Sequence, residues 1–427
     1  MAKKSREEKP REYTKRQLSH HKKQERRQKI ILFSGITVIV AVILLITGGW
    51  LFGEFLPLNK TIVTVYDTKI KQSMLIDTMV YFAQGNSGAD LSSQMDYILQ
   101  YMIQNELNKK AAAALGITIS DEDIEKSAGK KLNPAQKAMA YSSLLTAKLK
   151  TEYFNTQVPD SGNQVLMNAM LVESEELIPQ LRQDLLSTGN FSALADQYAV
   201  NRVSKDNKGV FEWHPASVLT TDIGTSIPVD WAFSENVSVG DISSGLSDNV
   251  SSKQLGYWLI RVNEAPVVTG EETSANISAL LVSSEAEALK VKALLEATND
   301  IASIADQYSQ YSPSQQGHGE LGIVTESQNI SAPFNSYVFD SNAVVGAWSA
   351  PVKDTQFWTK GGSWFVQLVD RSNDRAYSQG DKDTLIDKAY SDWTTGLWTG
   401  TTDKIIYTFG EEERAFALKR ANEKISG

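Results

Sequence analysis

Cysteine is absent from this 427-residue chain, and histidine occurs only four times. The absence of cysteine excludes disulfides, thiolate zinc sites, iron–sulfur clusters and thiol nucleophiles. The four histidines are His20, His21, His214 and His318, too few for a multi-histidine metal site. We therefore expect neither a metal nor a cofactor. Hydrophobic residues (41%) and charged residues (22%) occur in the proportions of folded soluble domains, which argues against wholesale disorder.

Positive charge is concentrated at the N-terminus. Residues 1–29 carry 12 Lys/Arg and 4 Asp/Glu, whereas the rest of the chain carries 30 Lys/Arg and 47 Asp/Glu. The acidic bulk should repel nucleic acid, so no nucleic-acid partner is expected. The basic arm could itself be a nucleic-acid-binding tail, but the segment that follows it favours a role in membrane topology.

An uncharged, apolar segment follows the basic arm. Residues 30–53 contain no charged side chain, and at ~1.5 Å per residue a helix of this length can cross a hydrocarbon layer of about 30 Å. The segment ends in bulky residues such as Trp50 and Phe52, not in the small residues of a cleavage site. We predict an uncleaved, single-pass helix in the lipid bilayer of the cell membrane, with the basic arm in the cytoplasm and the bulk of the chain outside. A cleaved signal peptide is the alternative.

Helical patterns dominate residues 58–160. Helix starts are signalled by Ser120 with Asp123 and by Asn133 with Pro134. Apolar residues recur at helical spacing along one predicted helix: Met95, Ile98, Leu99, Met102, Ile103, Leu107, Ala111 and Ala114. The same spacing returns near the C-terminus in Leu385, Ala389, Trp393 and Leu397. Both ends of the chain outside the membrane segment are therefore predicted to be helical.

An internal repeat lies between these helical regions. Residues 170–172 and 194–198 recur 110 positions later, whereas Phe233, Val239-Gly240 and Trp258 recur 106 positions later. Two consistent registers over about 100 residues make chance similarity improbable. Each copy reads as strand, helix, short helix, glycine-rich loop, strand, helix, strand, strand, which is an α+β pattern.

Each copy resembles a parvulin-type peptidyl-prolyl isomerase domain. The first copy contains Phe-Ser-Ala-Leu-Ala-Asp-Gln-Tyr at 191–198, Val-Gly-Asp-Ile-Ser at 239–243 and Gly-Tyr-Trp-Leu-Ile-Arg-Val at 256–262. The second contains Pro-Phe-x-x-x-x-Phe at 333–339 and Val-Gly-Ala-Trp-Ser-Ala-Pro-Val at 345–352. These motifs follow one another in the order found in parvulins.

The block before the repeat resembles the N-terminal domain of SurA/PrsA folding factors. The similar stretches are Val-Thr-Val-Tyr-Asp-Thr-Lys-Ile at 63–70 and Leu-Gly-Ile-Thr-Ile-Ser-Asp-Glu at 115–122. The resemblance covers about 58–415. It implies a chaperone domain that cradles unfolded polypeptides, completed by a C-terminal helix that returns to it.

The resemblance implies an α+β protein of six segments. They are a basic cytoplasmic arm (1–29), a transmembrane helix (30–53), a SurA-N-like helical chaperone domain (58–160), parvulin-like domain 1 (163–265), parvulin-like domain 2 (274–372) and a C-terminal helical segment that packs on the chaperone domain (380–427). Linkers are expected at 159–163, 266–274 and 373–380.

The parvulin site combines two facing histidines on neighbouring strands, an Asp or Cys, and a Leu–Met–Phe pocket for the proline ring. The resemblance places the two histidine positions at Ala169 and Trp258 in the first copy and at Ala279 and Trp364 in the second, and the Asp/Cys position near Asn201 and Tyr311. Every polar member is replaced, apart from the amide of Asn201. No residue of the chain is therefore assigned a catalytic role.

The apolar part of the site is better preserved in the second copy. It has Leu321, Ile330 and Phe334, whereas the first copy has Phe211 in place of the leucine and Pro228 in place of the phenylalanine. The expected proline-binding residues are Leu321, Ile330, Phe334, Trp364, Phe211 and Trp258. The two tryptophans either fill the space left by the histidines or offer an aromatic platform to apolar segments.

Two smaller groups of residues, histidines and methionines, are further candidates for function. His214 and His318 lie 104 positions apart, which matches neither repeat offset, so they are not equivalent and no catalytic role is assigned to them. Met74, Met79, Met95 and Met102 are read as helix core, with an adaptable binding surface as the alternative.

The sequence therefore predicts a membrane-anchored extracytoplasmic folding factor that binds unfolded exported polypeptides. Isomerase activity is expected to be absent in the first copy and weak or absent in the second, because no imidazole pair is available to the twisting amide. An active prolyl isomerase acting through the second copy is one alternative. A non-catalytic scaffold of the cell envelope is the other.

Overall fold

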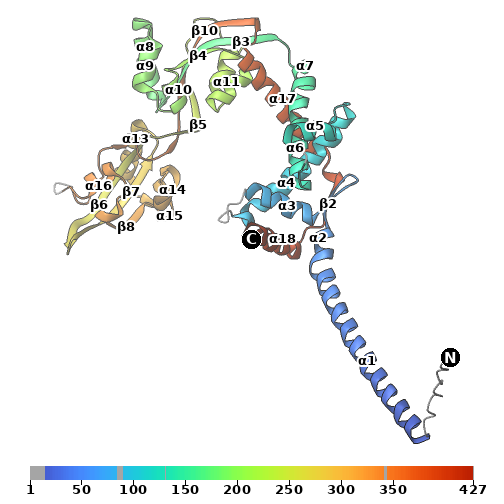
Figure 1. The fold of residues 1–427 in the computed structure, drawn as a ribbon. Helices are drawn as coiled ribbons and strands as arrows, with labels where there is room; N and C mark the ends of the chain where they lie inside the picture. Colours follow the sequence, from blue (N-terminus) through green and yellow to red (C-terminus); the bar gives the residue numbers. More distant parts are fainter. Residues whose placement is uncertain (1–14, 84–89, 130, 341–343, 427) are drawn as a thin grey trace, which may run out of the picture. The chain divides into compact units, whose positions relative to one another are not determined.

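The computed structural model describes residues 15–83, 90–129, 131–340 and 344–426 (Figure 1). Residues 1–14 of the predicted basic arm lie outside this part of the chain. The composition of 57% helix and 23% strand confirms the α+β class. The chain divides into two compact units, the first made of residues 1–155 and 389–427 and the second of residues 156–388.

The first unit begins with a long apolar helix. Helix α1 (Lys15–Trp50) continues into the π-helical turn η1 (Leu51–Phe55) and the short α2 (Leu56–Asn59). Within the described residues, Ile31–Asn59 is the one helical stretch long and apolar enough to cross a membrane. The expected apolar helix is therefore confirmed.

Helices also form most of the rest of the first unit. They are α3 (Gln72–Ala83), α4 (Leu91–Ala114), α5 (Asp121–Ala128), α6 (Pro134–Lys148), η2 (Leu149–Phe154) and α7 (Asn155–Gln157), the last crossing into the second unit. Both predicted helix starts are confirmed, because Ser120 and Asn133 form capping boxes with Asp123 and Gln136. The reciprocal hydrogen bonds satisfy backbone N–H groups that a helix start leaves free.

The C-terminal segment completes the sheet and core of this unit. Its elements are α17 (Gln379–Gly400), which starts in the second unit, η5 (Thr402–Lys404), β11 (Ile405–Tyr407) and α18 (Glu411–Ser426). Strand β1 (Thr61–Val65) lies between β2 (Thr68–Lys71) and β11, and all three strands are antiparallel. Residues separated by more than 300 positions therefore share one sheet.

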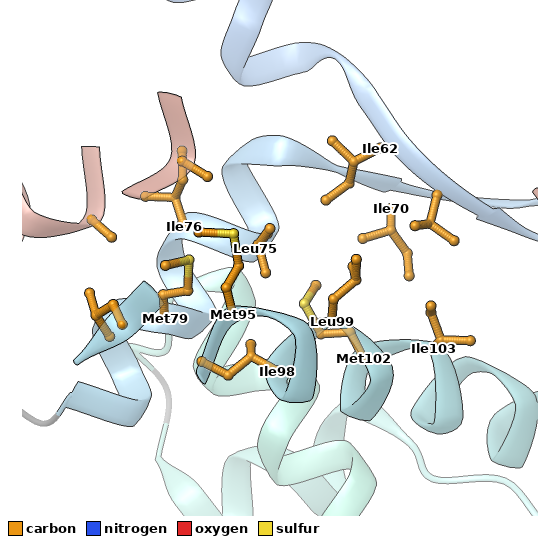
Figure 2. Close-up of a cluster of buried hydrophobic side chains, with 14 of the residues drawn as sticks. Ile62, Ile70, Leu75, Ile76, Met79, Met95, Ile98, Leu99, Met102 and Ile103 are labelled. Atoms are coloured by element: carbon orange, nitrogen blue, oxygen red, sulfur yellow. The ribbon is translucent and has the colours of Figure 1, made fainter. Parts of the chain in front are cut away.

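A single apolar core joins these elements. Ala417 and Ala421 of α18 are buried in the same cluster as Ile62, Leu75 and Ile98. Figure 2 shows the aliphatic and methionine side chains that α3 and α4 contribute to this cluster. Met79, Met95 and Met102 are buried in it, as the core interpretation of the methionines requires. Burial of these side chains is the main stabilising term for helices that would be marginal alone.

The second unit contains two lobes, each with a four-stranded sheet. The first lobe has strands β3 (Ser161–Val172), β4 (Val210–His214), β5 (Leu246–Lys253) and β10 (Thr359–Ala376) in the order β4-β3-β10-β5. The second lobe has strands β6 (Gly256–Thr269), β7 (Glu272–Val282), β8 (Glu320–Thr325) and β9 (Val352–Asp354) in the order β8-β7-β6-β9.

Equivalent helices follow the opening strand of each repeat. The first repeat has η3 (Glu175–Leu177), α8 (Ile178–Thr188), α9 (Phe191–Tyr198), α10 (Arg202–Asp206), α11 (Ala216–Ile223) and α12 (Ile227–Phe233). The second has α13 (Glu285–Thr298), α14 (Ile301–Tyr308), α15 (Ser312–Gln316), η4 (Glu326–Gln328) and α16 (Ala332–Val338). The glycine-rich loops also correspond, since the carbonyls of Gly209 and Gly319 accept hydrogen bonds from the backbone N–H groups of Ala169 and Ala279.

The two repeats exchange their closing strands. The closing strand of the first repeat, β6, pairs with β7 and β9 of the second, whereas the closing strand of the second, β10, pairs with β3 and β5 of the first. The two sheets therefore do not follow the segments 163–265 and 274–372 that the sequence predicted. The first lobe is assembled from two separated stretches of chain, and the second is continuous from β6 to β9.

The expected linker at 266–274 is wrong. Strands β6 and β7 form one hairpin, which closes with Thr269 opposite Glu272 through a two-residue turn at Gly270 and Glu271. Gly270 has a φ of 67°, a left-handed conformation that glycine adopts without steric cost. A two-residue turn makes β6 and β7 neighbours with little loop-closure entropy, and this local pairing accounts for the exchange.

Candidate functional site

The site of the first lobe is occupied by a buried tryptophan. Trp364 on β10 lies in one apolar cluster with Ala169 on β3 and Phe211 on β4, and all three side chains are buried. The indole Nε1–H of Trp364 donates a hydrogen bond of 2.9 Å to Oδ2 of Asp248, which is also buried. A buried tryptophan bonded to a buried aspartate therefore lies beside Ala169, one of the positions that the resemblance assigned to the histidines.

The site of the second lobe has the same arrangement. Trp258 on β6 lies in one cluster with Ala279 and Phe334, and its Nε1–H donates a hydrogen bond of 2.8 Å to Oδ2 of the buried Asp354. Leu321, Ile330 and Tyr311 pack against this cluster as half-buried side chains. The predicted pocket residues of the second copy are thus brought together, with Trp258 among them.

The expected partners of the two tryptophans are exchanged. The sequence paired Ala169 with Trp258 and Ala279 with Trp364, but the structure places Ala169 with Trp364 and Ala279 with Trp258. Likewise, Trp364 lies in the first lobe, away from Leu321, Ile330 and Phe334. Phe211 also lies in the first lobe, away from Trp258. The correction follows directly from the exchange of β6 and β10, because each closing strand carries its tryptophan into the other sheet.

Aromatic rings fill the interior of the second lobe. The ring of Trp258 lies edge-on to Tyr311, Phe334 and Phe357, with centroid separations of 5.1, 4.9 and 5.3 Å. Such edge-to-face contacts stabilise beyond the area they bury. Trp258 and Phe334 are fully buried, so neither ring is available to a ligand in this conformation. In the second lobe, Trp258 therefore fills the space inside the lobe and does not form an exposed aromatic platform.

The first lobe keeps an open cavity of about 500 Å³ beside its buried tryptophan. Residues that line it include Asn201, Ile223, Ile227, Asp248, Val250 and Trp358. Asn201 is 9% exposed, and its Oδ1 has no hydrogen-bond partner among the residues that the structure describes. Trp358 is 62% exposed. The lobe predicted to have the poorer pocket thus has an open cavity, lined by polar and apolar residues, with an accessible indole.

Hydrogen bonds hold Asp248 in its charged form. Burial alone would raise the pKa of this carboxyl group, but hydrogen bonds from Ser251, Trp364 and the Val250 backbone together lower it. The contacts of Asp248 with Ser251 N and Val250 N are both 2.8 Å. An ionised acceptor strengthens the bond to the indole N–H, so Asp248 fixes the orientation of Trp364.

A buried lysine lies where the chain passes from one lobe to the other. Lys253, at the end of β5, faces Thr359 at the start of β10, and its ammonium group donates a hydrogen bond to the carbonyl of Gly361. Burial lowers the pKa of Lys253 to about 8, an effect that Glu287, Glu173 and Asp248 partly oppose. Lys253 therefore holds β10 to β5 at the point of exchange.

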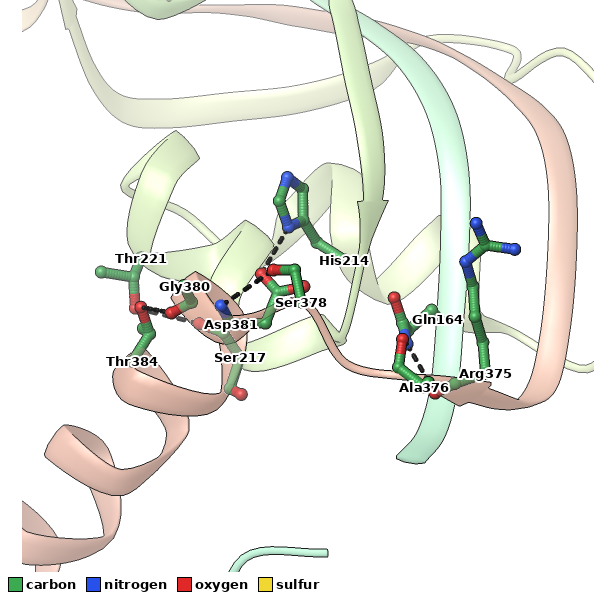
Figure 3. A network of polar contacts seen from close by, with 10 residues as sticks. All are labelled: Gln164, His214, Ser217, Thr221, Arg375, Ala376, Ser378, Gly380, Asp381 and Thr384. Carbon is green, nitrogen blue, oxygen red and sulfur yellow. Dashed lines mark hydrogen bonds and ion pairs between the residues drawn. The ribbon is translucent and has the colours of Figure 1, made fainter. Parts of the chain in front are cut away.

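His214 and His318 do not belong to these sites. His214 on β4 faces Asp381 near the start of α17, with 2.6 Å between Nδ1 and Oδ1 (Figure 3). This contact ties the first turn of α17 to the first lobe, and the Ser378 hydroxyl accepts a hydrogen bond from the Asp381 N–H within the same turn. His318 is exposed and bonds to Asp306. Both contacts are structural in character.

The sequence comparisons point to parvulins and to PrsA. No family model matches the chain. A parvulin-like PPIase of Rickettsia conorii is 24% identical over 256 residues, which cover 55% of this chain and 85% of that protein. The foldase protein PrsA of Caldanaerobacter subterraneus is 23% identical over 201 residues, which cover 43% of this chain and 62% of that protein. These relatives confirm that the chain is similar to parvulin-type folding factors.

A solved structure is also similar. The crystal structure of the peptidylprolyl isomerase PrsA from Bacillus anthracis aligns with 76% of this chain and 97% of its own, at 12% identity and a TM-score of 0.28.

Several residues of these sites escaped the sequence analysis. Asp248 and Asp354 lie 106 positions apart, the same offset that relates Trp258 to Trp364, so the repeat itself carries a signal for both hydrogen bonds. Trp358 is not part of a repeated motif. Its position beside the cavity depends on the path of the chain into β10, which has no local sequence signal.

Proposed function

We propose that this protein is a membrane-anchored, extracytoplasmic folding factor that binds unfolded exported polypeptides without relying on prolyl isomerisation. One observation carries the proposal. At the positions that the resemblance assigns to the facing histidines, each lobe has an alanine and a buried tryptophan whose indole is bonded to a buried aspartate. The similarity to parvulin-like and PrsA proteins supports the class of folding factor.

The chemistry of the reaction explains why the replacement matters. The barrier to rotation about a peptide bond is about 18–20 kcal/mol and reflects the loss of amide resonance. A catalyst lowers it with a preorganised environment for the twisted amide, and loss of one such polar contact typically reduces rates by about 10²–10³ in other enzymes. In the second lobe, aromatic rings occupy that space. Polypeptide binding does not require this catalytic environment, so it is the function that we propose.

A test of polypeptide binding separates a folding factor from a scaffold. The full chain in detergent micelles should suppress the aggregation of a chemically unfolded, exported model protein at near-stoichiometric ratios, relative to empty micelles. A scaffold without unfolded clients should leave the aggregation curve unchanged. That result would contradict the proposal.

The membrane part of the proposal rests on the apolar helix and the basic residues before it. The helix Ile31–Asn59 has no charged residue before Glu54, and the arm of residues 1–29 holds 12 Lys/Arg, which favours a cytoplasmic N-terminus. Protease added to sealed cells should degrade the chain beyond about residue 57. A soluble form with a new N-terminus near residue 50 would instead identify a cleaved signal peptide.

The open cavity of the first lobe supports a second candidate function, a weak prolyl isomerase. The exposed ring of Trp358 could contact a proline, and Asn201, which also lines the cavity, stands at the position that the resemblance assigns to the Asp or Cys of parvulins. Activity on a short X–Pro peptide that disappears in Asn201→Leu would favour this candidate. Activity that survives this substitution would exclude the first-lobe cavity as its source.

A further inference from the structure

The first unit contains a cavity of about 350 Å³ beside the β1–β2 hairpin. This volume lies in the range of about 300–1,000 Å³ that is typical of ligand pockets. Its apolar wall is formed by Ile70, Met74, Met102, Ala138 and Met139. Ile70 and Met102 belong to the core seen in Figure 2, so the cavity opens from a fixed base. Met74 and Met139 are half-buried, and their flexible side chains can adapt to different apolar groups.

The cavity follows the unpaired edge of β2. All four residues of β2, Thr68–Lys71, line it, although successive side chains of a strand point to opposite faces. A cavity that touches both faces of a strand must reach around one edge. The other edge of β2 is paired with β1, whose residues are not among those that line the cavity. No strand of the described chain pairs with the free edge.

Positive charge marks this edge. Lys69 and Lys71 are exposed on β2 and line the cavity. Lys71 bonds to the side chain of Asn59 at 3.2 Å, and Lys69 has no acidic partner within the described residues. Asp77 also lines the cavity, but the ammonium group of Lys424 neutralises it at 2.6 Å. The charge beside the free edge is therefore mainly positive, with Glu106 on the helical wall opposite.

We infer that an extended segment of an unfolded polypeptide adds as a strand to the free edge of β2 and inserts one apolar side chain into the methionine-lined cavity. The inference rests on the proposed function and specifies where and how a client is bound. Backbone pairing gives affinity that does not depend on sequence, whereas the pocket beside the edge selects a side chain. An edge strand offers unpaired N–H and C=O groups for this purpose.

The side chains of β2 specify the client sequence. Cross-strand neighbours lie on the same face of a sheet, so alternate client residues come to lie opposite Lys69 and Lys71. The client residue between them lies opposite Ile70 and faces the apolar cavity. A triplet of acidic, large apolar and acidic residues therefore fits best. Basic residues in the outer positions place like charges opposite each other, which is unfavourable.

Peptide binding to the full chain in detergent micelles tests this inference. The probe is a fluorescein-labelled decapeptide with a central Glu-Leu-Glu in a background of threonine and serine. We expect it to bind at least about tenfold more tightly than the Glu-Ala-Glu peptide, because the leucine side chain is lost from the pocket, and more tightly than the Lys-Leu-Lys peptide. Equal affinities for the three peptides, or no binding of any of them, would overturn the inference.

Two further measurements test the cavity and the strand pairing. Met139→Asp introduces a charge into the apolar wall and should weaken binding of the Glu-Leu-Glu peptide about tenfold or more, whereas Ser143→Asp, an exposed position on the same helix, should not. N-methylation of alternate peptide residues removes N–H donors on one edge of the added strand. One of the two alternate sets should abolish binding and the other should preserve it. Equal effects of the two N-methylated sets would contradict strand addition. Equal effects of the two variants would contradict insertion of a side chain into the cavity.

Aggregation suppression distinguishes failure of the inference from failure of the proposed function. If the full chain protects an unfolded client but Met139→Asp leaves peptide affinity unchanged, clients bind elsewhere and only the inference fails. If the chain neither protects a client nor binds any of the peptides, the proposed function fails as well.

Discussion

The two lobes of the second unit share a sheet order and a buried Trp–Asp hydrogen bond, but their interiors are filled differently. In the second lobe, Trp258 is enclosed by three aromatic rings. In the first lobe, a cavity is lined by Asp248, the partner of the equivalent Trp364, and by Asn201 and Trp358. One copy therefore has a closed aromatic core, and the other has an open cavity. The Trp–Asp bond is common to both copies, and the residues around it differ.

The largest expected difference between the lobes concerns independent folding. Residues 256–354 contain all four strands of the second sheet, whereas residues 161–253 lack β10, which lies between β3 and β5. The 256–354 fragment should therefore unfold cooperatively, and the 161–253 fragment should be unfolded. Circular dichroism during urea titration measures both. Cooperative unfolding of residues 161–253 would show that the first lobe does not need the exchanged strand.

The next largest difference is expected between the buried Trp258 of the second lobe and the exposed Trp358 beside the cavity of the first lobe. Trp258→Ala removes a fully buried ring from the second lobe and should lower the free energy of unfolding by about 3–5 kcal/mol. Trp358→Ala removes a ring that is 62% exposed and should change it by less than about 0.5 kcal/mol. Chemical denaturation of the two variants gives the comparison. Similar losses would mean that Trp358 is also a packing residue.

The buried Lys253 predicts a pH dependence at the point of strand exchange. Its pKa is lowered to about 8 in the folded chain, so between about pH 8 and 10.5 the unfolded state binds more protons than the folded state. The free energy of unfolding should therefore rise with pH in this window, by about 1–2 kcal/mol between pH 7.5 and 9.5. Lys253→Met should lose this increment. The exposed Lys360→Met serves as a control and should keep it. An unchanged pH profile in Lys253→Met would show that another group titrates.

The smallest effect is expected at Asn201. Its buried Oδ1 has no partner among the described residues, and replacing an unsatisfied polar group with an apolar one is neutral or stabilising. Asn201→Leu should therefore change the free energy of unfolding by less than about 1 kcal/mol, and in the favourable direction. If urea denaturation showed that the free energy of unfolding falls by more than about 2 kcal/mol, Asn201 would have a structural role.

The sequence predicted the elements of this protein better than their pairing. Periodicity and capping signals located α3, α4, α5 and α6, and the repeat offsets located equivalent strands and helices. The exchange of β6 and β10 could not be predicted, because Trp258 and Trp364 lie in closing strands of similar pattern that fit either sheet. The return of the C-terminal segment to the first core followed from the family resemblance and not from local patterns, because α18 joins that core through contacts between residues far apart in sequence. The apolar character of both sites was predicted, but their partners and the open cavity depend on the exchange.

We propose above that this folding factor binds polypeptides without catalysing prolyl isomerisation. A protease-coupled assay of a short X–Pro peptide, performed with a preparation of the full chain that suppresses client aggregation, tests it most directly. We predict a rate equal to that of the uncatalysed reaction, both for the original chain and for Phe334→Ala. An isomerisation rate near that of an ordinary parvulin, abolished by Phe334→Ala or by Asn201→Leu, would contradict the account.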